Sequence, residues 1–446
     1  MSTRTRPRRT TQIFCASTLY GAVTLAAAID SGCFGSADRR MLLVTNNAPV
    51  PETTPALDEA EGFARLRGRF DSVLSWNEVI SPLHPGGWTP RASDLPLLQR
   101  HLRRLWDLGD DRVELALESI QVTPALAIAQ LLPEAPITVY ADGLMSYGPT
   151  RNKIDPLIGG RVSRLLHLDL VPGLAPLLLG EFGAVPEAVP VEAFTKCVEE
   201  LAGPSPAGGP AAEDGPALLL GQYLAALNLL TAAEEEELHL RMVRGAVALG
   251  HRRLVFKPHP TAPDAWSRSL VRAAEELGAE LTVEDRPVLA EVLYRELRPA
   301  LVVGCFSTAL LTAHTFYGLP VARVGTRPLL ERLTPFQNSN RIPLTVVDAV
   351  VPPLDDPAGG GAGIGTGELN DLVAAVGFAM QPKIRPELRT AAVRHLSGPL
   401  AERTRHHFTR RRLTALGLPG GLPLPRHPQV RRLARRALRL RRALKR

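Results

Sequence analysis

Residues 301–309 read Leu-Val-Val-Gly-Cys-Phe-Ser-Thr-Ala, an apolar run that ends in a glycine and two hydroxyl residues. The run Ala300–Val303 predicts a buried strand, and the segment Ser307–Tyr317 predicts the helix that follows it. A strand that turns directly into a helix is a repeating unit of doubly wound α/β sheets. Because ligands bind just beyond the carboxyl ends of the strands in such sheets, a site is expected at this turn.

The alternation of short apolar runs with helical patterns extends in both directions. The rest of the second half predicts strands at Pro320–Val324, Leu218–Leu220 and Arg253–Lys257, and helices at Ala232–Leu249 and Ala265–Leu277. The first half predicts strands at Gln12–Ala16, Met41–Thr45, Ser72–Trp76, Val113–Glu118 and Ile137–Tyr140, and helices between them, for example at Leu95–Leu108 and Pro124–Leu132. This β–α–β alternation predicts an α/β protein with parallel sheets covered on both faces.

A run rich in Gly, Pro and Ala at residues 203–216 has no periodicity and is typical of an interdomain linker. We therefore expect two doubly wound Rossmann-like domains, residues 1–202 and 217–400, with an active-site cleft between them. Residues 401–446 are expected to form a basic C-terminal tail that is at least partly helical.

The N-terminal segment fits two interpretations. A basic leader at Arg4–Arg9 and an apolar run at Ile13–Ile29 resemble a signal peptide. Hydroxyl side chains interrupt that run, and it also fits a strand at Thr11–Ala16 that turns into a helix near Ser17, which is the interpretation we favour. No run of about 18 uninterrupted apolar residues occurs, so no transmembrane helix is expected.

The charge of the chain is concentrated at one end. The formal net charge is +7, but residues 431–446 hold nine basic residues and no acidic one, which leaves 43 basic against 45 acidic residues elsewhere. A nearly neutral body lacks the basic face that nucleic-acid binding requires, so no nucleic-acid partner is expected. The cysteines fit neither a disulfide framework nor a zinc site, and we expect reduced thiols in a cytoplasmic protein.

The basic end predicts an amphipathic helix at Val430–Arg446. Leu433, Ala437, Leu440 and Leu444 share one face of this helix, and arginines occupy the rest. Such a helix suits peripheral contact with the anionic inner surface of the cell membrane. Binding of an anionic glycan and a disordered solubilising tail are the alternatives, and the sequence leaves the oligomeric state open.

The strongest local motif is Lys257-Pro258-His259-Pro260, which follows a predicted strand. The two prolines restrict the backbone on both sides of His259, and an imidazole fixed there can bind a phosphate or protonate a leaving group. The dipeptide His-Pro also occurs at residues 84–85 and 427–428, but neither of these follows a clear strand.

Ser307 and Thr308 open the helix predicted after residues 301–304. Backbone amides at a helix N-terminus favour anions, and the two hydroxyls add donors, although Ser307 also fits a simple helix cap. Glu291 lies on a helix 16 residues earlier. Its carboxylate is a candidate to bind two ribose hydroxyls, and a solvated helix face is the alternative.

In the first half, Ala141-Asp142-Gly143 ends the strand predicted at Ile137–Tyr140. Asp142 is expected to point into the cleft from the lobe opposite to His259, where a carboxylate can take a proton from a hydroxyl. Asp-Gly is also a common turn, which is the alternative explanation.

Taken together, these motifs resemble those of the bacterial α-2,8-polysialyltransferases. That family shares a D/E-D/E-G motif, an HP motif and a paired Ser/Thr motif, which match Ala141-Asp142-Gly143, His259-Pro260 and Ser307-Thr308 in the same order. Gln12–Tyr20, Leu220-Gly221-Gln222 and Asp142–Arg151 are similar to the family as well. The resemblance covers about residues 10–400 as an architecture and implies the GT-B glycosyltransferase fold.

The resemblance implies an inverting, metal-independent transfer of sialic acid from CMP-sialic acid to an anionic glycan in capsule synthesis, with no cofactor. The catalytic residues are then Asp142, as general base, and His259, which contacts the CMP phosphate and assists its departure. The implied donor-binding residues are Gly221, Gln222, Lys257, Pro260, Glu291, Ser307 and Thr308. The implied acceptor-side residues are Ser17, Thr18, Gly143, Ser146 and Arg151.

One departure bears on the chemistry, because Ala141 stands where the family usually has its first acid. Either Asp142 is the base, or the base comes from elsewhere, or the acceptor chemistry differs. Other cytidine donors, CMP-Kdo or CDP-glycerol, and an inactive nucleotide-sugar-binding protein are the competing functions.

Overall fold

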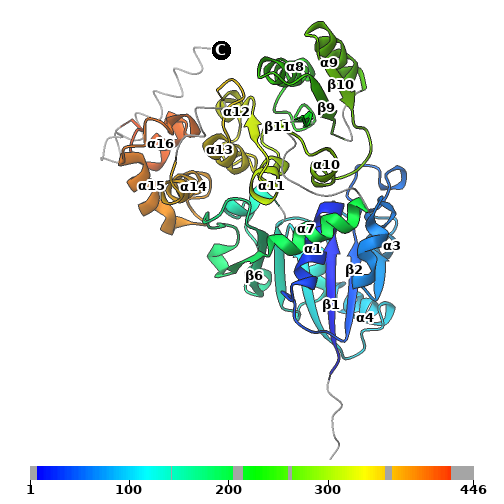
Figure 1. Cartoon of the computed structure of the whole chain (residues 1–446). Helices are drawn as coiled ribbons and strands as arrows, with labels where there is room; N and C mark the ends of the chain where they lie inside the picture. The colour runs from blue at the N-terminus through cyan, green and yellow to red at the C-terminus, as the bar shows by residue number, and fades with distance from the viewer. Residues whose placement is uncertain are drawn as a thin grey trace, which may run out of the picture.

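The computed structural model describes residues 8–141, 143–203, 214–222, 224–259, 264–356 and 364–422. Two parallel sheets lie in separate lobes (Figure 1). The first sheet has the order β3 (Ser72–Ser75), β2 (Arg39–Val44), β1 (Thr10–Ala16), β4 (Arg112–Glu118), β5 (Ile137–Ala141), β6 (Val162–Leu168) and β7 (Val185–Val189). The second has the order β10 (Glu280–Val283), β9 (Arg253–Lys257), β8 (Ala217–Leu220), β11 (Leu301–Gly304) and β12 (Val321–Arg323).

The central strands are buried on both faces, as parallel strands between helical layers are. Phe14 and Ala16 of β1 contribute to one apolar cluster and Ile13 and Cys15 to another, because successive side chains of a strand point to opposite faces. The expected α/β architecture of two doubly wound parallel sheets is confirmed. Since β1 pairs with both β2 and β4, the strand interpretation of the N-terminal segment is correct as well.

Helices cover both faces of the first sheet. On one face lie α1 (Leu19–Asp30), α7 (Val191–Ala202) and the short α2 (Phe63–Leu66). On the other lie α3 (Trp76–Ile80), α4 (Leu95–Leu105), α5 (Ala125–Leu131) and the short α6 (Pro156–Gly159).

The second lobe contains α8 (Ala232–Ala248), α9 (Asp264–Glu276), α10 (Ala290–Leu297), α11 (Thr308–Tyr317), α12 (Thr326–Arg332) and α13 (Arg341–Val350). Its longest helix, α8, begins with a capping box. The Thr231 hydroxyl accepts a hydrogen bond from the Glu234 amide at 3.2 Å, and the Glu234 carboxylate accepts one from the Thr231 amide at 2.9 Å. These two contacts satisfy backbone donors that the first helical turn leaves open.

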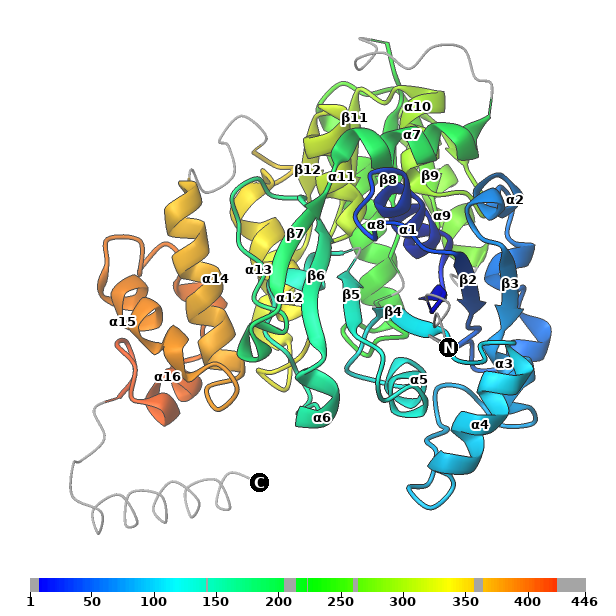
Figure 2. The same cartoon turned by 90° about the horizontal axis from the view of Figure 1, so that it is seen from below.

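The C-terminal helices α14 (Thr366–Met380), α15 (Arg389–Ser397) and α16 (Arg410–Leu416) lie together at one side of the molecule (Figure 2). They return to the first lobe, because the Gln381 amide donates to the Arg151 carbonyl at 2.8 Å. Residues 401–422, which the sequence assigned to the tail, pack into this body through the buried Phe408 and Leu413. The helix expected at 430–446 and most of the linker, residues 204–213, lie outside the described residues.

Helix α7 joins the two lobes. The rings of Phe194 on α7 and Phe316 on α11 have centroids 5.6 Å apart in an edge-to-face arrangement. Glu199 on α7 forms an ion pair with Arg295 on α10. One continuous apolar cluster therefore runs from the α1 face of the first sheet into the second lobe.

Two further observations concern membrane-spanning helices and the cysteines. Across the residues that the structure describes, we find no helix that combines the length and the apolar character needed to cross a bilayer. All four cysteines are free thiols, and three of them are buried: Cys15, Cys197 and Cys305.

Candidate active site

A cavity of about 420 Å³ lies where the carboxyl ends of the two sheets face each other. Residues from both lobes line it, as expected for a cleft between doubly wound domains. The lining includes six residues that the sequence selected, namely Gly143, Ser146, Arg151, Gln222, Ser307 and Thr308. The structure thus brings residues 143–151 of the first lobe and the Ser307-Thr308 pair of the second into one place.

The first-lobe side of the cavity begins at the end of β5. Ala141 is the last residue of the strand, and Gly143 precedes a short 3₁₀ turn, η4 (Leu144–Tyr147). The buried Ser146 hydroxyl donates to the Gly143 carbonyl at 3.0 Å and so fixes the turn. Asp142, the proposed base, lies outside the described residues.

The second-lobe side is the turn from β11 into α11. Ser307 is the N-cap of α11, and its hydroxyl accepts a hydrogen bond from the Ala309 amide at 3.2 Å. The Gln222 side-chain carbonyl, just beyond β8, accepts one from the Phe306 amide at 2.9 Å. Gln222 therefore holds the turn that presents the two hydroxyls.

The two sides touch at Thr308. The Leu144 amide of the first lobe donates to the Thr308 hydroxyl at 3.5 Å. A Cβ atom added at Gly143 would lie 3.1 Å from the same hydroxyl oxygen, which is tighter than ordinary van der Waals contact. The glycine therefore permits the close approach of the two lobes.

His259 follows β9, and only β8 separates β9 from β11 in the sheet. His259 and Ser307 therefore follow strands on either side of β8, but His259 is not among the residues that line the cavity. The His259 residue is exposed. Partial desolvation lowers the pKa of its ring, and the nearby Lys257 ammonium lowers it further. Pro260 lies outside the described residues.

Two other donor-side residues have structural contacts. The Lys257 ammonium donates to the Arg286 carbonyl at 2.9 Å, and burial, opposed by the carboxylate of Glu284, lowers its pKa. The Gly221 amide donates to the Lys257 carbonyl at 2.9 Å, and a Cβ added at Gly221 would lie 2.9 Å from the Phe256 ring. Gly221 thus allows β8 and β9 to pack closely beside the site.

Glu291 is not on a solvated helix face, so that alternative is wrong. Its side chain is 2% exposed, and its carboxylate accepts a hydrogen bond from the Thr312 hydroxyl at 2.6 Å. Burial raises the pKa of Glu291, and the hydrogen bond from Thr312 partly opposes this shift. A ribose role for Glu291 stays a prediction that this buried position does not favour, because α10 packs against α11 at this point.

The acceptor-side candidates Ser17 and Thr18 lie at the turn from β1 into α1. Thr18 is the N-cap of α1, and its hydroxyl accepts from the Gly21 amide at 3.0 Å. The Ser17 hydroxyl donates to the carboxylate of Glu118. Ser17 therefore contacts an acidic residue that the sequence interpretation did not select.

Glu118 is the last residue of β4 and lines the cavity. Its carboxylate also accepts a hydrogen bond from the Tyr140 hydroxyl at 3.1 Å. Burial raises its pKa, and the hydrogen bonds from Ser17 and Tyr140 partly oppose this. Glu118 could have been selected from the sequence, because it is an acidic residue at the end of the strand predicted at Val113–Glu118.

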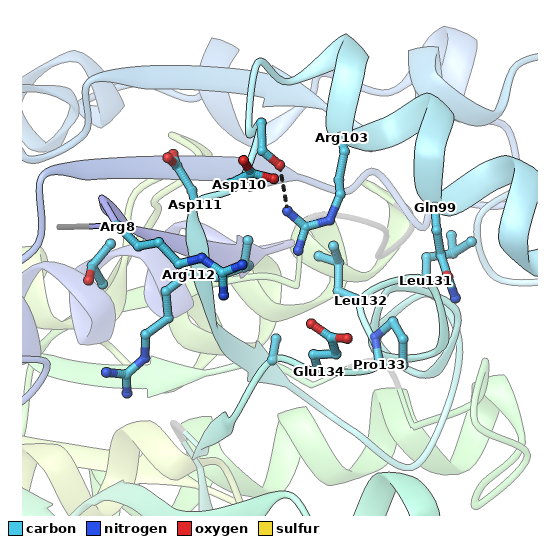
Figure 3. A pocket seen from close by; sticks show the side chains of 14 residues that line it. Arg8, Gln99, Arg103, Asp110, Asp111, Arg112, Leu131, Leu132, Pro133 and Glu134 are labelled. Carbon is cyan, nitrogen blue, oxygen red and sulfur yellow. Dashed lines mark hydrogen bonds between the residues drawn. The ribbon is translucent and has the colours of Figure 1, made fainter. Parts of the chain in front are cut away.

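A second cavity, of about 490 Å³, lies at the opposite edge of the first sheet (Figure 3). Arg112, the first residue of β4, and Arg8, which precedes β1, help to line it. The Arg103 guanidinium beside them donates to the Gly109 carbonyl at 2.9 Å. Because this pocket is at the amino ends of the strands and contains none of the predicted site residues, we do not assign it to catalysis.

The order of the motifs around the first cavity agrees with a known family. The family model for alpha-2,8-polysialyltransferase matches residues 12–326, which include the cavity residues Glu118, Gly143, Ser146, Arg151, Gln222, Ser307 and Thr308. The chain belongs to the alpha-2,8-polysialyltransferase family. It is a glycosyltransferase.

Solved glycosyltransferase structures are similar to this polysialyltransferase-family protein at low identity. The O-GlcNAc transferase of Thermobaculum terrenum is 16% identical with a TM-score of 0.38, and the match covers 90% of this chain and 68% of that one. MurG of Acinetobacter baumannii is 12% identical with a TM-score of 0.39, covering 89% and 98% of the two chains. A UDP-glucosyltransferase of Polygonum tinctorium is 13% identical with a TM-score of 0.42, covering 90% and 98%. No curated protein sequence matches the chain.

Proposed function

We propose that the protein transfers a sialyl residue from CMP-sialic acid to a hydroxyl group of an anionic glycan, with inversion at the anomeric carbon and without a metal ion. One observation carries the proposal. The amino end of α11, with Ser307 and Thr308, faces Gly143, Ser146 and Arg151 in a single cavity between the lobes. Membership in the alpha-2,8-polysialyltransferase family supports the choice of donor.

Departure of CMP builds negative charge on its phosphate, and the start of α11 offers donors for that charge. The hydroxyls of Ser307 and Thr308 each accept a hydrogen bond from a backbone amide, which leaves both O–H protons available to a phosphate oxygen. The open amides and positive end of the helix add to the attraction. Donors fixed in this way stabilise the leaving group without reorganisation.

His259 is proposed to complete the leaving-group site from the other side of β8. The spacing of about 10 Å between β9 and β11 fits a phosphate held between His259 and the α11 end. An imidazole at this position donates a hydrogen bond or a proton to the departing CMP.

Arg151 is proposed to bind a carboxylate of the sialylated substrate. It lines the cavity, and burial lowers the pKa of its guanidinium. Burial thus disfavours the charged guanidinium, and in the part of the chain that the structure describes no acidic side chain forms an ion pair with Arg151. A sialic acid carboxylate would supply the missing charge through paired hydrogen bonds.

The donor is tested first by thermal shift with CMP, UMP, GMP and ADP. A nucleotide present at about 100 times its Kd stabilises the folded state by about 2.7 kcal/mol, and we expect this from CMP alone. CMP release is then followed from CMP-sialic acid, CMP-Kdo and CDP-glycerol in the presence of a sialylated glycan. Preferred turnover of CMP-Kdo or CDP-glycerol would reassign the donor, and CMP binding without any turnover would indicate an inactive nucleotide-sugar-binding protein.

A further inference from the structure

Transfer to a hydroxyl group requires a proton acceptor on the first-lobe side of the cavity. Among the described residues that line the cavity, Glu118 is the only carboxylate, and no imidazole or amine side chain accompanies it. Ala141 at the end of β5 has no titratable group at all. The chemistry available in the described cavity therefore depends on Glu118.

The fold places Glu118 beside the end of β5. Glu118 of β4 is the register partner of Tyr140 in β5, one residue before Ala141. Both residues therefore end at the same carboxyl edge, and their strands are direct neighbours about 4.8 Å apart. The Glu118 side chain lies on the same face of the sheet as that of Tyr140, whereas Ala141 packs on the opposite face, so Glu118 reaches the cavity from the α1 side of the sheet.

Two hydroxyls orient the carboxylate. Ser17, from the turn between β1 and α1, donates to Oε1, and Tyr140 donates to Oε2 at 3.1 Å. The Tyr140 hydroxyl has a single proton, which it divides between Oε2 and the Cys15 carbonyl at 2.7 Å. The Ser17 backbone amide contacts the carboxylate as well. Of the four acceptor sites on the two carboxylate oxygens, these contacts occupy three and leave one for a substrate hydroxyl.

We propose that Glu118 is the catalytic base that takes the proton from the acceptor hydroxyl. The inference rests on the proposed sialyl transfer. The acceptor oxygen forms a bond to the anomeric carbon as the bond from that carbon to the CMP phosphate oxygen breaks. The electron pair of the broken bond leaves with CMP, and the acceptor proton passes to the Glu118 carboxylate and then to water.

The electrostatics of the position support this role. Burial raises the pKa of Glu118, opposed by the hydrogen bonds from Ser17 and Tyr140, and a base is more effective when its pKa lies nearer the working pH. The neighbouring titratable group on β1 is the Cys15 thiol, whose own pKa is raised by burial and by the Glu118 charge. The Arg151 guanidinium also lines the cavity.

The test compares E118Q with E114Q, a matched change on the same strand at the end away from the cavity. Loss of a general base lowers the rate by about 100-fold to 10,000-fold, so we expect E118Q to lose at least about 100-fold in transfer. CMP affinity by thermal shift should stay within about twofold of the wild type for both variants, and E114Q should transfer normally. The acidic limb of the pH profile of kcat/KM should be absent in E118Q.

Azide supplies a second readout, because this nucleophile has no proton to remove. Added azide should restore CMP release in E118A and give sialyl azide, which a merely structural role for Glu118 would not produce. Transfer by E118Q at more than half the wild-type rate, or loss of transfer in D142N with E118Q active, would overturn the inference and leave the sialyl transfer standing. Failure of the wild type to bind CMP or use CMP-sialic acid would instead overturn the proposed function, and the base assignment with it.

Discussion

The backbone amide of Leu144 in the first lobe donates to the side-chain hydroxyl of Thr308 in the second, with 3.5 Å between nitrogen and oxygen. This contact joins the turn after β5 to the first residue of α11 at the proposed leaving-group site. One hydrogen bond thus connects the part of the cavity proposed for the acceptor substrate with the part proposed for the donor substrate.

Thr308→Val keeps the shape of the side chain and removes the hydroxyl. We expect a loss of about 100-fold or more in kcat/KM with CMP-sialic acid, because removal of one fixed donor to a developing anion typically costs about 2.7–4 kcal/mol. Initial rates of CMP release measure the effect. Thr195→Val on α7, where the hydroxyl donates to the Glu192 carbonyl at 3.2 Å, is the control and should match the wild type.

His259→Ala should lower kcat by about 100-fold or more, because the departing CMP then lacks its proposed proton donor. His84→Ala is a matched control, since residues 84–85 form the same dipeptide in the first lobe, where the His84 ring lies 2.9 Å from the Ala48 carbonyl. Single-turnover rates separate this effect from donor binding. Equal losses in the two variants would argue against a specific role for His259.

Arg151→Met should raise KM for a sialylated acceptor by about 10-fold to 100-fold, the range that loss of a charged hydrogen bond of about 1.5–3 kcal/mol predicts. The KM for a neutral acceptor should change little, which provides the internal control. Arg151→Lys should recover only part of the affinity, because lysine lacks the bidentate geometry of arginine. An unchanged preference for the anionic acceptor would exclude the proposed carboxylate contact.

Acid should destabilise the folded state through His407. Burial, with a smaller contribution from the neighbouring His406, lowers the pKa of His407 from 6.5 to about 3. Below about pH 6.5 the unfolded chain therefore binds a proton that the folded state does not bind. The free energy of unfolding thus falls as the pH falls toward 3. At pH 5 this one group accounts for about 2 kcal/mol of the free energy of unfolding.

Urea denaturation between pH 7.5 and 5 measures this effect. His407→Leu should flatten the pH dependence over that range, even though the variant will itself be less stable at neutral pH. His101→Asn, at an exposed position of α4, should leave the slope unchanged. A slope that persists in full in His407→Leu would contradict the assignment.

The buried strands could be predicted from the sequence because their apolar runs are nearly continuous. Nine of the twelve strands of the described structure, including β1 and β11, were predicted to within about two residues. The three that were missed have weaker patterns. β7 and β10 are edge strands with several exposed positions, and Pro186 in β7 is tolerated because an edge strand need not donate on both sides. β6 contains Arg164 and His167, which interrupt its apolar run.

Site residues that directly follow a strand could be predicted from the sequence. Features that depend on how side chains of different elements pack together could not. Ser307 and Thr308 lie in the cavity because β11 ends just before them. The burial of Glu291 could not be predicted, because helical periodicity alone does not say which face another helix covers, and α11 covers this one. Glu118 could have been selected as the acid at the end of a predicted strand, but its contacts with Ser17 of the β1–α1 turn and Tyr140 of β5 required the structure.

The apolar contact between Phe194 and Phe316 has a consequence for how substrates reach the cavity. Parting the lobes along this seam would expose aromatic surface to water, at about 25 cal/mol for each Å² uncovered. We therefore expect substrates to reach the cavity without separation of the lobes, with the Phe194–Phe316 contact kept throughout the catalytic cycle.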